Sequence, residues 1–248
     1  MKFILGKKIE MSQVYKADGT VVPVTLVSAG PCFITQIKKK DKDGYLALQV
    51  GFQEKKKITK PLKGHLKGLS NFKYLNEFRL DEKDQAELER GQKITVNVFQ
   101  PGEKVKATGI SKGKGFLGIV KRYGFSGAPH SHGTKDQSRH SGSVGAKGPA
   151  RTFKGTKMGG RTGGEQVSVK NLEIMEIDEK NNILKIKGAI PGTRDSLIRI
   201  SAPGEMKFAS EEIKKSSSAE ASEDKEKEIK EIEPEITVSA QENSSNKE

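Results

Sequence analysis

The sequence has a single cysteine, no long apolar run and, over a central stretch of about sixty residues, almost no acidic residue. With Cys32 alone an internal disulfide is impossible, and a reducing compartment is expected. The alternating neighbours CFITQI favour a buried small side chain over a reactive thiol at this position. No run approaches the ~20 apolar residues of a membrane span, and MKFILGKKIEM has too few for a signal peptide. A cytoplasmic protein without a membrane partner is expected.

The scarcity of acidic residues is most pronounced between Lys104 and Gly164, where 13 Lys and Arg stand against Asp136 alone. Such a block repels itself unless an anionic partner neutralises it, and nucleic acid is the leading candidate, ahead of a membrane surface. One carboxylate offers no acid–base pair, so this region has little with which to run a hydrolase mechanism. We therefore expect no catalytic residue and no small-molecule substrate.

Short runs rich in β-branched and aromatic residues predict a mainly β fold with few short helices. Asp18-Gly19 and Asp43-Gly44 are hairpin-type turns between the first of these runs. Because closure removes exposed strand edges, a closed or nearly closed β-barrel is favoured. A short helix is expected over Asp84 to Arg90. The expected strands are Val21–Ser28, Cys32–Lys39, Tyr45–Phe52, Lys93–Phe99, Glu165–Asp178, Ile183–Ile190 and Ser196–Ile200.

Regular patterning nearly vanishes over residues 112–164, called the excursion below, which would leave the barrel and return to it. We expect one barrel domain over residues 1–208 that includes this long irregular basic loop. Residues 209–248 form an acidic tail: from Ser210 onward it has 12 acidic and 6 basic residues and no aromatic side chain. Such a composition buries too little apolar surface to order itself, which predicts disorder.

Three patterns in the excursion could suggest other chemistry. Gly113, Gly115 and Gly118 match the dinucleotide spacing G-x-G-x-x-G, but the chain after Tyr123 has no buried strand to present Asp136 to a ribose. The stretch GTKMGGRT is one residue from a phosphate-binding Walker loop, yet it lacks the lysine and leads into a strand pattern. Three histidines lack the cysteines and spacing of zinc sites, so no metal and no cofactor is expected: His130, His132 and His140.

Lysine, arginine and glycine together instead suit a phosphate backbone, because the cations neutralise phosphates and glycine lets the chain approach them. Four aromatic rings are spaced so that they could stack or wedge against bases: Phe116, Tyr123, Phe125 and Phe153. The alternative is a flexible, solvated basic linker without a binding role. Because ordering so long a segment costs much backbone entropy, a single structure would require a large polyanion as partner. The candidate RNA-binding residues are Lys112, Lys114, Lys121, Arg122, Arg139, His140, Lys147, Arg151, Lys154, Lys157 and Arg161.

At this point the sequence resembles a known family, universal ribosomal protein three of the large subunit in its bacterial form, over roughly residues 1–207. FQPGEKVKATGISKGKGFLGIVKR follows the family signature, with Lys106 as one departure. Ser141 is another, where the family often has proline. Further landmarks in the expected order are SHG at Ser131, GSVG at Gly142, FKGTKMGGRTG at Phe153, KGAIPG at Lys187 and the opening GKKIEMSQVYKADGTVVPVTLV.

The resemblance implies a translation-factor-like β-barrel that binds 23S rRNA, helps nucleate subunit assembly and extends its basic loop towards the peptidyl-transferase centre. It implies large-subunit proteins fourteen and nineteen as neighbours and a cytoplasmic location within the ribosome. Two rival functions stay open here. A free-standing nucleic-acid-binding protein would not co-sediment with large subunits in high salt, and a nucleotide-dependent enzyme would bind NAD or ATP saturably.

Overall fold

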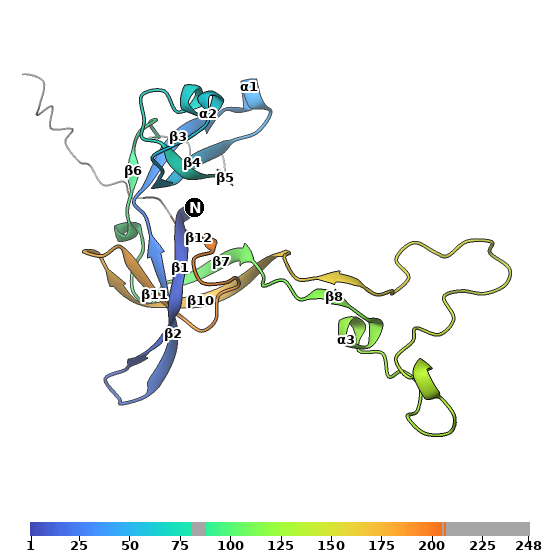
Figure 1. Cartoon of the computed structure of the whole chain (residues 1–248). Helices are drawn as coiled ribbons and strands as arrows, with labels where there is room; N and C mark the ends of the chain where they lie inside the picture. Colours follow the sequence, from blue (N-terminus) through green and yellow to red (C-terminus); the bar gives the residue numbers. More distant parts are fainter. Residues whose placement is uncertain (81–87, 205, 207–248) are drawn as a thin grey trace, which may run out of the picture. The chain divides into compact units, whose positions relative to one another are not determined.

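Six antiparallel strands close into a barrel, as the computed structural model of the chain shows for residues 1–80, 88–204 and 206 (Figure 1). The strands are β1 (Lys2–Tyr15), β2 (Val21–Ala29), β7 (Lys104–Ile110), β10 (Gln166–Asp178), β11 (Ile183–Lys187) and β12 (Leu197–Ala202). Around the barrel they follow the order β1-β12-β7-β10-β11-β2, and β2 pairs with β1 to complete the circle. The prediction of a mainly β chain with a closed barrel is confirmed.

Alternation of apolar and polar side chains explains why these segments form the barrel wall. In β12, LIRISA, every second residue is buried, and these are Ile198, Ile200 and Ala202. In β11 the buried positions are Leu184 and Ile186. Successive side chains of a strand point to opposite faces, so this period of two directs one set into the barrel and leaves the other outside.

A second sheet shares its core with the barrel. It has the order β5-β4-β3-β6 and consists of β3 (Cys32–Lys38), β4 (Ala47–Glu54), β5 (Phe72–Arg79) and β6 (Lys93–Ile94). The ring of Phe3 in β1 stacks on that of Phe78 in β5 at 4.3 Å between centroids. Cys32 is fully buried in the shared core, as predicted, and burial raises the pKa of its thiol to about 12.

The described residues contain only short helices: α1 (Lys40–Asp43), α2 (Lys60–His65), α3 (Ile119–Tyr123) and the 3₁₀ turns η2 (Val96–Val98) and η3 (Lys135–Gln137). The turn predicted at Asp43-Gly44 exists in modified form, because α1 precedes it and Gly44 caps that helix in the left-handed region at φ 78°. Of the helix predicted at Asp84–Arg90, residues 84–87 lie outside the described residues, and residues 88–90 are not helical. The tail, residues 209–248, lies wholly outside the described residues.

The predicted strand Lys93–Phe99 is wrong beyond its first two residues. Only Lys93 and Ile94 pair with β3, after which the chain turns through η2. Val98 and Phe99 are both buried, at 5% and 3% exposure. Neighbours on a strand point to opposite faces, so a strand here would have exposed one of them. The 3₁₀ turn directs both into the core before the chain enters β7.

Candidate nucleic-acid interface

The excursion leaves and rejoins the barrel at neighbouring strand ends. Ile110, the last residue of β7, is paired with Gln166, the first of β10. Beyond this pair the backbone N–H of Ser111 donates to the carbonyl of Glu165 at 2.9 Å, and Gly164 N–H donates back to Ser111 at 3.2 Å. The antiparallel ladder of the barrel therefore continues into the excursion and holds its two ends together.

Gly163 shows why the base of the excursion requires glycine. Its φ is +78°, in the left-handed region, and a Cβ built on it would overlap the backbone carbonyl of Lys112. The two chains approach closely here, and Lys114 N–H donates to Thr162 at 2.9 Å just beyond. Only a residue without a side chain combines that backbone angle with that contact.

A two-stranded ribbon, which the sequence did not predict, forms the next part of the excursion. β8 (Gly115–Leu117) pairs antiparallel with β9 (Gly160–Thr162), and Phe116 lies opposite Arg161. The Phe116 side chain is 76% exposed. Three-residue strands give no periodic signal, and their pairing joins segments more than forty residues apart. The ribbon presents an unburied aromatic ring beside a cation, a combination suited to stacking on a base next to a phosphate.

The short helix α3 follows β8, and one of its side chains contacts the returning side of the excursion. Gly124 ends α3 in the left-handed region at φ 73°. Arg122 is half-buried, and its Nη1 donates to the carbonyl of Met158 on the returning chain at 3.0 Å. Arg122 was predicted to bind phosphate, and the structure gives its guanidinium a contact within the excursion as well.

Cations and aromatic rings gather around Tyr123. The guanidinium of Arg122 lies 5.0 Å from the ring centroid and Lys157 Nζ lies 5.7 Å from it. Lys157 Nζ is also 6.0 Å from the ring of Phe125, which is tilted against Tyr123 with 6.4 Å between centroids. The structure thus brings together two predicted cations and two predicted stacking rings from opposite sides of the excursion.

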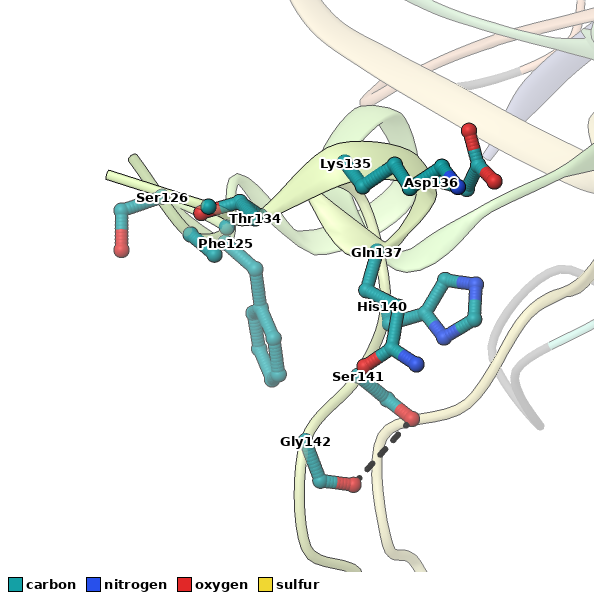
Figure 2. Close-up of a pocket in the computed structure, with 12 residues that line it drawn as sticks. Phe125, Ser126, Thr134, Lys135, Asp136, Gln137, His140, Ser141 and Gly142 are labelled. Carbon is teal, nitrogen blue, oxygen red and sulfur yellow. Dashed lines mark hydrogen bonds between the residues drawn. The ribbon is translucent and has the colours of Figure 1, made fainter. Parts of the chain in front are cut away.

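The tip of the excursion folds around an open hollow of about 840 Å³, which Figure 2 shows with its lining side chains. Ala128 N–H donates to Ser138 at 2.9 Å and His140 N–H to Gln137 at 3.2 Å, so backbone hydrogen bonds shape it. His140 lies in the lining beside Gln137 (Figure 2). The lining is polar and small-residue rich, with Phe125 as its large ring.

Among the described residues, the cations of the excursion have no carboxylate counter-ion. Of the eleven predicted binding residues all but the half-buried Arg122 are exposed. Within the part of the chain that the structure describes, none of them lies within 4 Å of a carboxylate, whereas the barrel and second sheet contain pairs such as Lys7–Asp195 at 2.9 Å and Lys38–Glu77 at 2.8 Å. An array of unpaired cations on a glycine-rich backbone is what a polyanion would neutralise.

Lys8 is a basic residue that the sequence reasoning missed. It is buried on β1, and its Nζ donates to the carbonyls of Ile190 at 2.7 Å and Gly192 at 3.3 Å. Burial, and after it the charge of Lys112, holds its pKa below the usual value. Lys8 therefore fixes the loop between β11 and β12, next to the start of the excursion. A lysine among other lysines of a strand offers no sequence signal for this role.

The enzyme-like patterns do not build the sites they resemble. The G-x-G-x-x-G stretch forms an antiparallel ribbon and a five-residue helix, not the parallel β-α-β unit of a dinucleotide fold. GTKMGGRT leads into β9 and β10. Over the described residues no three metal-ligating side chains gather in one place. No helix in the same part of the chain is long and apolar enough to span a membrane.

A closed barrel that carries an exposed cationic excursion has the features expected of a protein that binds an extended polyanion such as RNA. The Ribosomal protein L3 family matches residues 79–183. The chain is 49% identical to large ribosomal subunit protein uL3 of Carboxydothermus hydrogenoformans, over 80% of this chain and 96% of the relative. It is 48% identical to the uL3 proteins of Thermosipho africanus (81% and 97%) and Pseudothermotoga lettingae (82% and 98%).

The chain therefore belongs to the ribosomal protein L3 family, and the resemblance seen in its sequence is confirmed. This is a structural family of the large ribosomal subunit, so the nucleotide-dependent enzyme is rejected.

Proposed function

We propose that this protein is a structural constituent of the large ribosomal subunit, in the cytoplasm, and that its excursion binds 23S rRNA directly. The observation that supports direct binding is the set of exposed cations without carboxylate partners among the described residues, on a backbone that glycines keep slim. Each such cation can neutralise one phosphate and release its counter-ion, which favours binding at low salt. The named relatives are large-subunit proteins, which supports 23S rRNA as the polyanion.

The base and the tip of the excursion have different proposed roles. The paired part near the barrel, with Phe116 opposite Arg161, offers cations and rings at a defined spacing. The tip around Ser141 is the part farthest along the chain from both ends at Ser111 and Glu165. We propose that this tip extends towards the peptidyl-transferase centre and that the protein helps nucleate assembly. Large-subunit proteins fourteen and nineteen are the proposed neighbours.

An excision variant tests direct binding. Because Ser111 and Glu165 are hydrogen-bonded to each other, residues 114–163 can be removed so that Lys112, Gly113 and Gly164 form a short turn. We expect the barrel to keep its melting temperature, while affinity for a 23S rRNA transcript falls by orders of magnitude in 0.1 M salt. Unchanged affinity would contradict rRNA binding through the excursion. Loss of the intact chain from large subunits in high-salt sedimentation would instead favour a free-standing nucleic-acid-binding protein.

The position of the tip can be probed with one thiol. Cys32 is fully buried and its thiol pKa is raised, so it should not react with a thiol reagent. Ser141→Cys therefore introduces an exposed cysteine that can be labelled selectively. An iron chelate tethered there should cleave 23S rRNA at the peptidyl-transferase centre in reconstituted subunits. The matched control, Lys180→Cys in the exposed turn between β10 and β11, should cleave elsewhere. Identical cleavage from both sites would contradict the proposed placement of the tip.

A further inference from the structure

A second concentration of lysines lies outside the excursion, in the connection between β4 and β5. Residues 55–73, which are this connection and the first two residues of β5, contain seven lysines and no acidic residue, a higher density than the eleven cations in the 53 residues of the excursion. All seven are exposed. Lys55 N–H donates to the carbonyl of Asn71 at 2.8 Å, so the segment is a loop with a closed base. Its helix, α2, follows β4 and precedes β5 in the chain and lies near the second sheet in Figure 1.

The helix α2 and the turn that follows it separate lysines from leucines. Leu66 is 1% exposed, and Leu62 and Leu69 are half-buried on the same side. Lys60, Lys63 and Lys67, spaced by three and four residues, occupy the opposite, solvent side. Lys60 and Lys63 both lie on α2, where side chains three residues apart are neighbours, and Lys67 lies in the turn that follows the helix. We call these three residues the α2 lysine face.

Contacts with the second sheet hold this face in place. Arg90 Nε donates to Thr35 in β3 at 2.9 Å, and its Nη2 donates to the carbonyls of His65 and Lys67 at 3.1 Å each. The His65 ring lies 2.7 Å from the Gln49 side chain of β4. One guanidinium thereby ties the end of α2, at His65, and the following turn, at Lys67, to the sheet. A fixed row of cations loses less freedom on binding than a row on a mobile loop.

We propose that the α2 lysine face, with Lys55, Lys56 and Lys57 beside it in sequence, is a second RNA-binding surface that contacts the phosphate backbone independently of the excursion. Within the described residues none of these lysines pairs with a carboxylate. The segment has no exposed large apolar side chain. A protein partner would need such an anchor, and lysine is depleted in protein interfaces, whereas compact ammonium charges suit phosphates.

This inference rests on the proposed function, because it takes the same class of polyanion as its ligand. The two surfaces are nevertheless separate parts of the fold. The excursion arises between β7 and β10 of the barrel, and the α2 lysine face lies between β4 and β5 of the second sheet. Two attachments on different sheets would fix the orientation of the protein on RNA, which a single extended loop does not.

Binding of the full chain to a 23S rRNA transcript tests the proposal. One variant replaces three lysines together: Lys60→Gln, Lys63→Gln and Lys67→Gln. It should make the slope of log affinity against log salt shallower by about 2–3, and it should weaken binding about a hundredfold at 0.1 M salt. The control removes three scattered exposed lysines: Lys16→Gln, Lys42→Gln, Lys180→Gln. It should change the slope little. Circular dichroism checks that both variants remain folded.

Lysine acetylation read by mass spectrometry gives a second measurement. Lys60, Lys63 and Lys67 should be protected in the binary complex of wild-type chain and 23S rRNA, and reactive in the free protein. If the excursion binds but the α2 variant matches the control, the second surface is rejected and the proposed function stands. If the excision variant also retains its affinity, the proposed function itself fails. Protection that appears only in complete subunits would assign this face to a neighbouring protein and overturn the proposal.

Discussion

Arg122 and Met158 are joined by a hydrogen bond of 3.0 Å although they are 36 residues apart in the chain. The guanidinium donates to a backbone carbonyl, so it ties α3 on the outgoing side to the returning side just before β9. Together with the β8–β9 pairs, this contact shows that the inner half of the excursion has structure of its own. An outer tip can then be presented to RNA from a defined base.

Replacing Arg122 with lysine should loosen that base. Lysine keeps the charge but cannot place a guanidinium both at the Met158 carbonyl and over the Tyr123 ring. Loss of about 1 kcal/mol makes local opening about fivefold more frequent. Hydrogen exchange of the Lys114 amide, bonded to Thr162, should therefore become faster. The exposed Arg151→Lys is the control, and equal exchange in both variants would refute a bracing role for Arg122.

Two adjacent glycines permit a matched test of the crossing at the barrel exit. Both Gly163 and Gly164 have positive φ, but a Cβ on Gly163 would overlap the Lys112 carbonyl while one on Gly164 meets nothing within 4 Å. Gly164→Ala should therefore destabilise this conformation by only the backbone strain of a positive φ, about 1–2 kcal/mol. Gly163→Ala should cost about 1–3 kcal/mol more and weaken rRNA binding further. Equal effects, measured by hydrogen exchange at Lys114 and by filter binding, would show that the close approach is unimportant.

Neutralising the returning side should weaken rRNA binding without affecting the barrel. Lys154, Lys157 and Arg161 are exposed, and their replacement by glutamine retains hydrogen-bonding ability and much of the length. If each neutralises one phosphate, the slope of log affinity against log salt becomes shallower by about 2–3. The melting temperature should stay the same. A lower melting temperature with an unchanged slope would mean that these residues stabilise the fold instead.

The acidic tail should be dispensable for assembly. Residues 210–248 have a net formal charge of −6, with 12 acidic and 6 basic residues, and rRNA repels such a segment. A chain that ends at Ala209 is expected to enter reconstituted large subunits as efficiently as the full chain, measured by sedimentation. Failure of the shortened chain to enter subunits would assign the tail a role in assembly.

Much of the fold could be predicted because it depends on local pattern. The alternation in LIRISA and ILKIK specifies strands with one buried face, and both became barrel strands. The strand predicted at Lys93–Phe99 failed because Val98 and Phe99 are both pulled into a core shared by two sheets. That demand comes from packing between distant segments, and no period within seven residues encodes it.

The sequence by itself predicted the class of ligand, because thirteen cations against one acid over residues 104–164 favour a polyanionic partner whatever the fold. It also determined the family, through ordered motifs. Only the tertiary structure decided how the excursion is built. The β8–β9 ribbon, the Arg122–Met158 bond and the gathering of Lys157 with Tyr123 and Phe125 join residues distant in the chain. Such pairings form once the barrel brings Ser111 and Glu165 together, because closing those ends removes most of the entropy that opposes contact between the two sides.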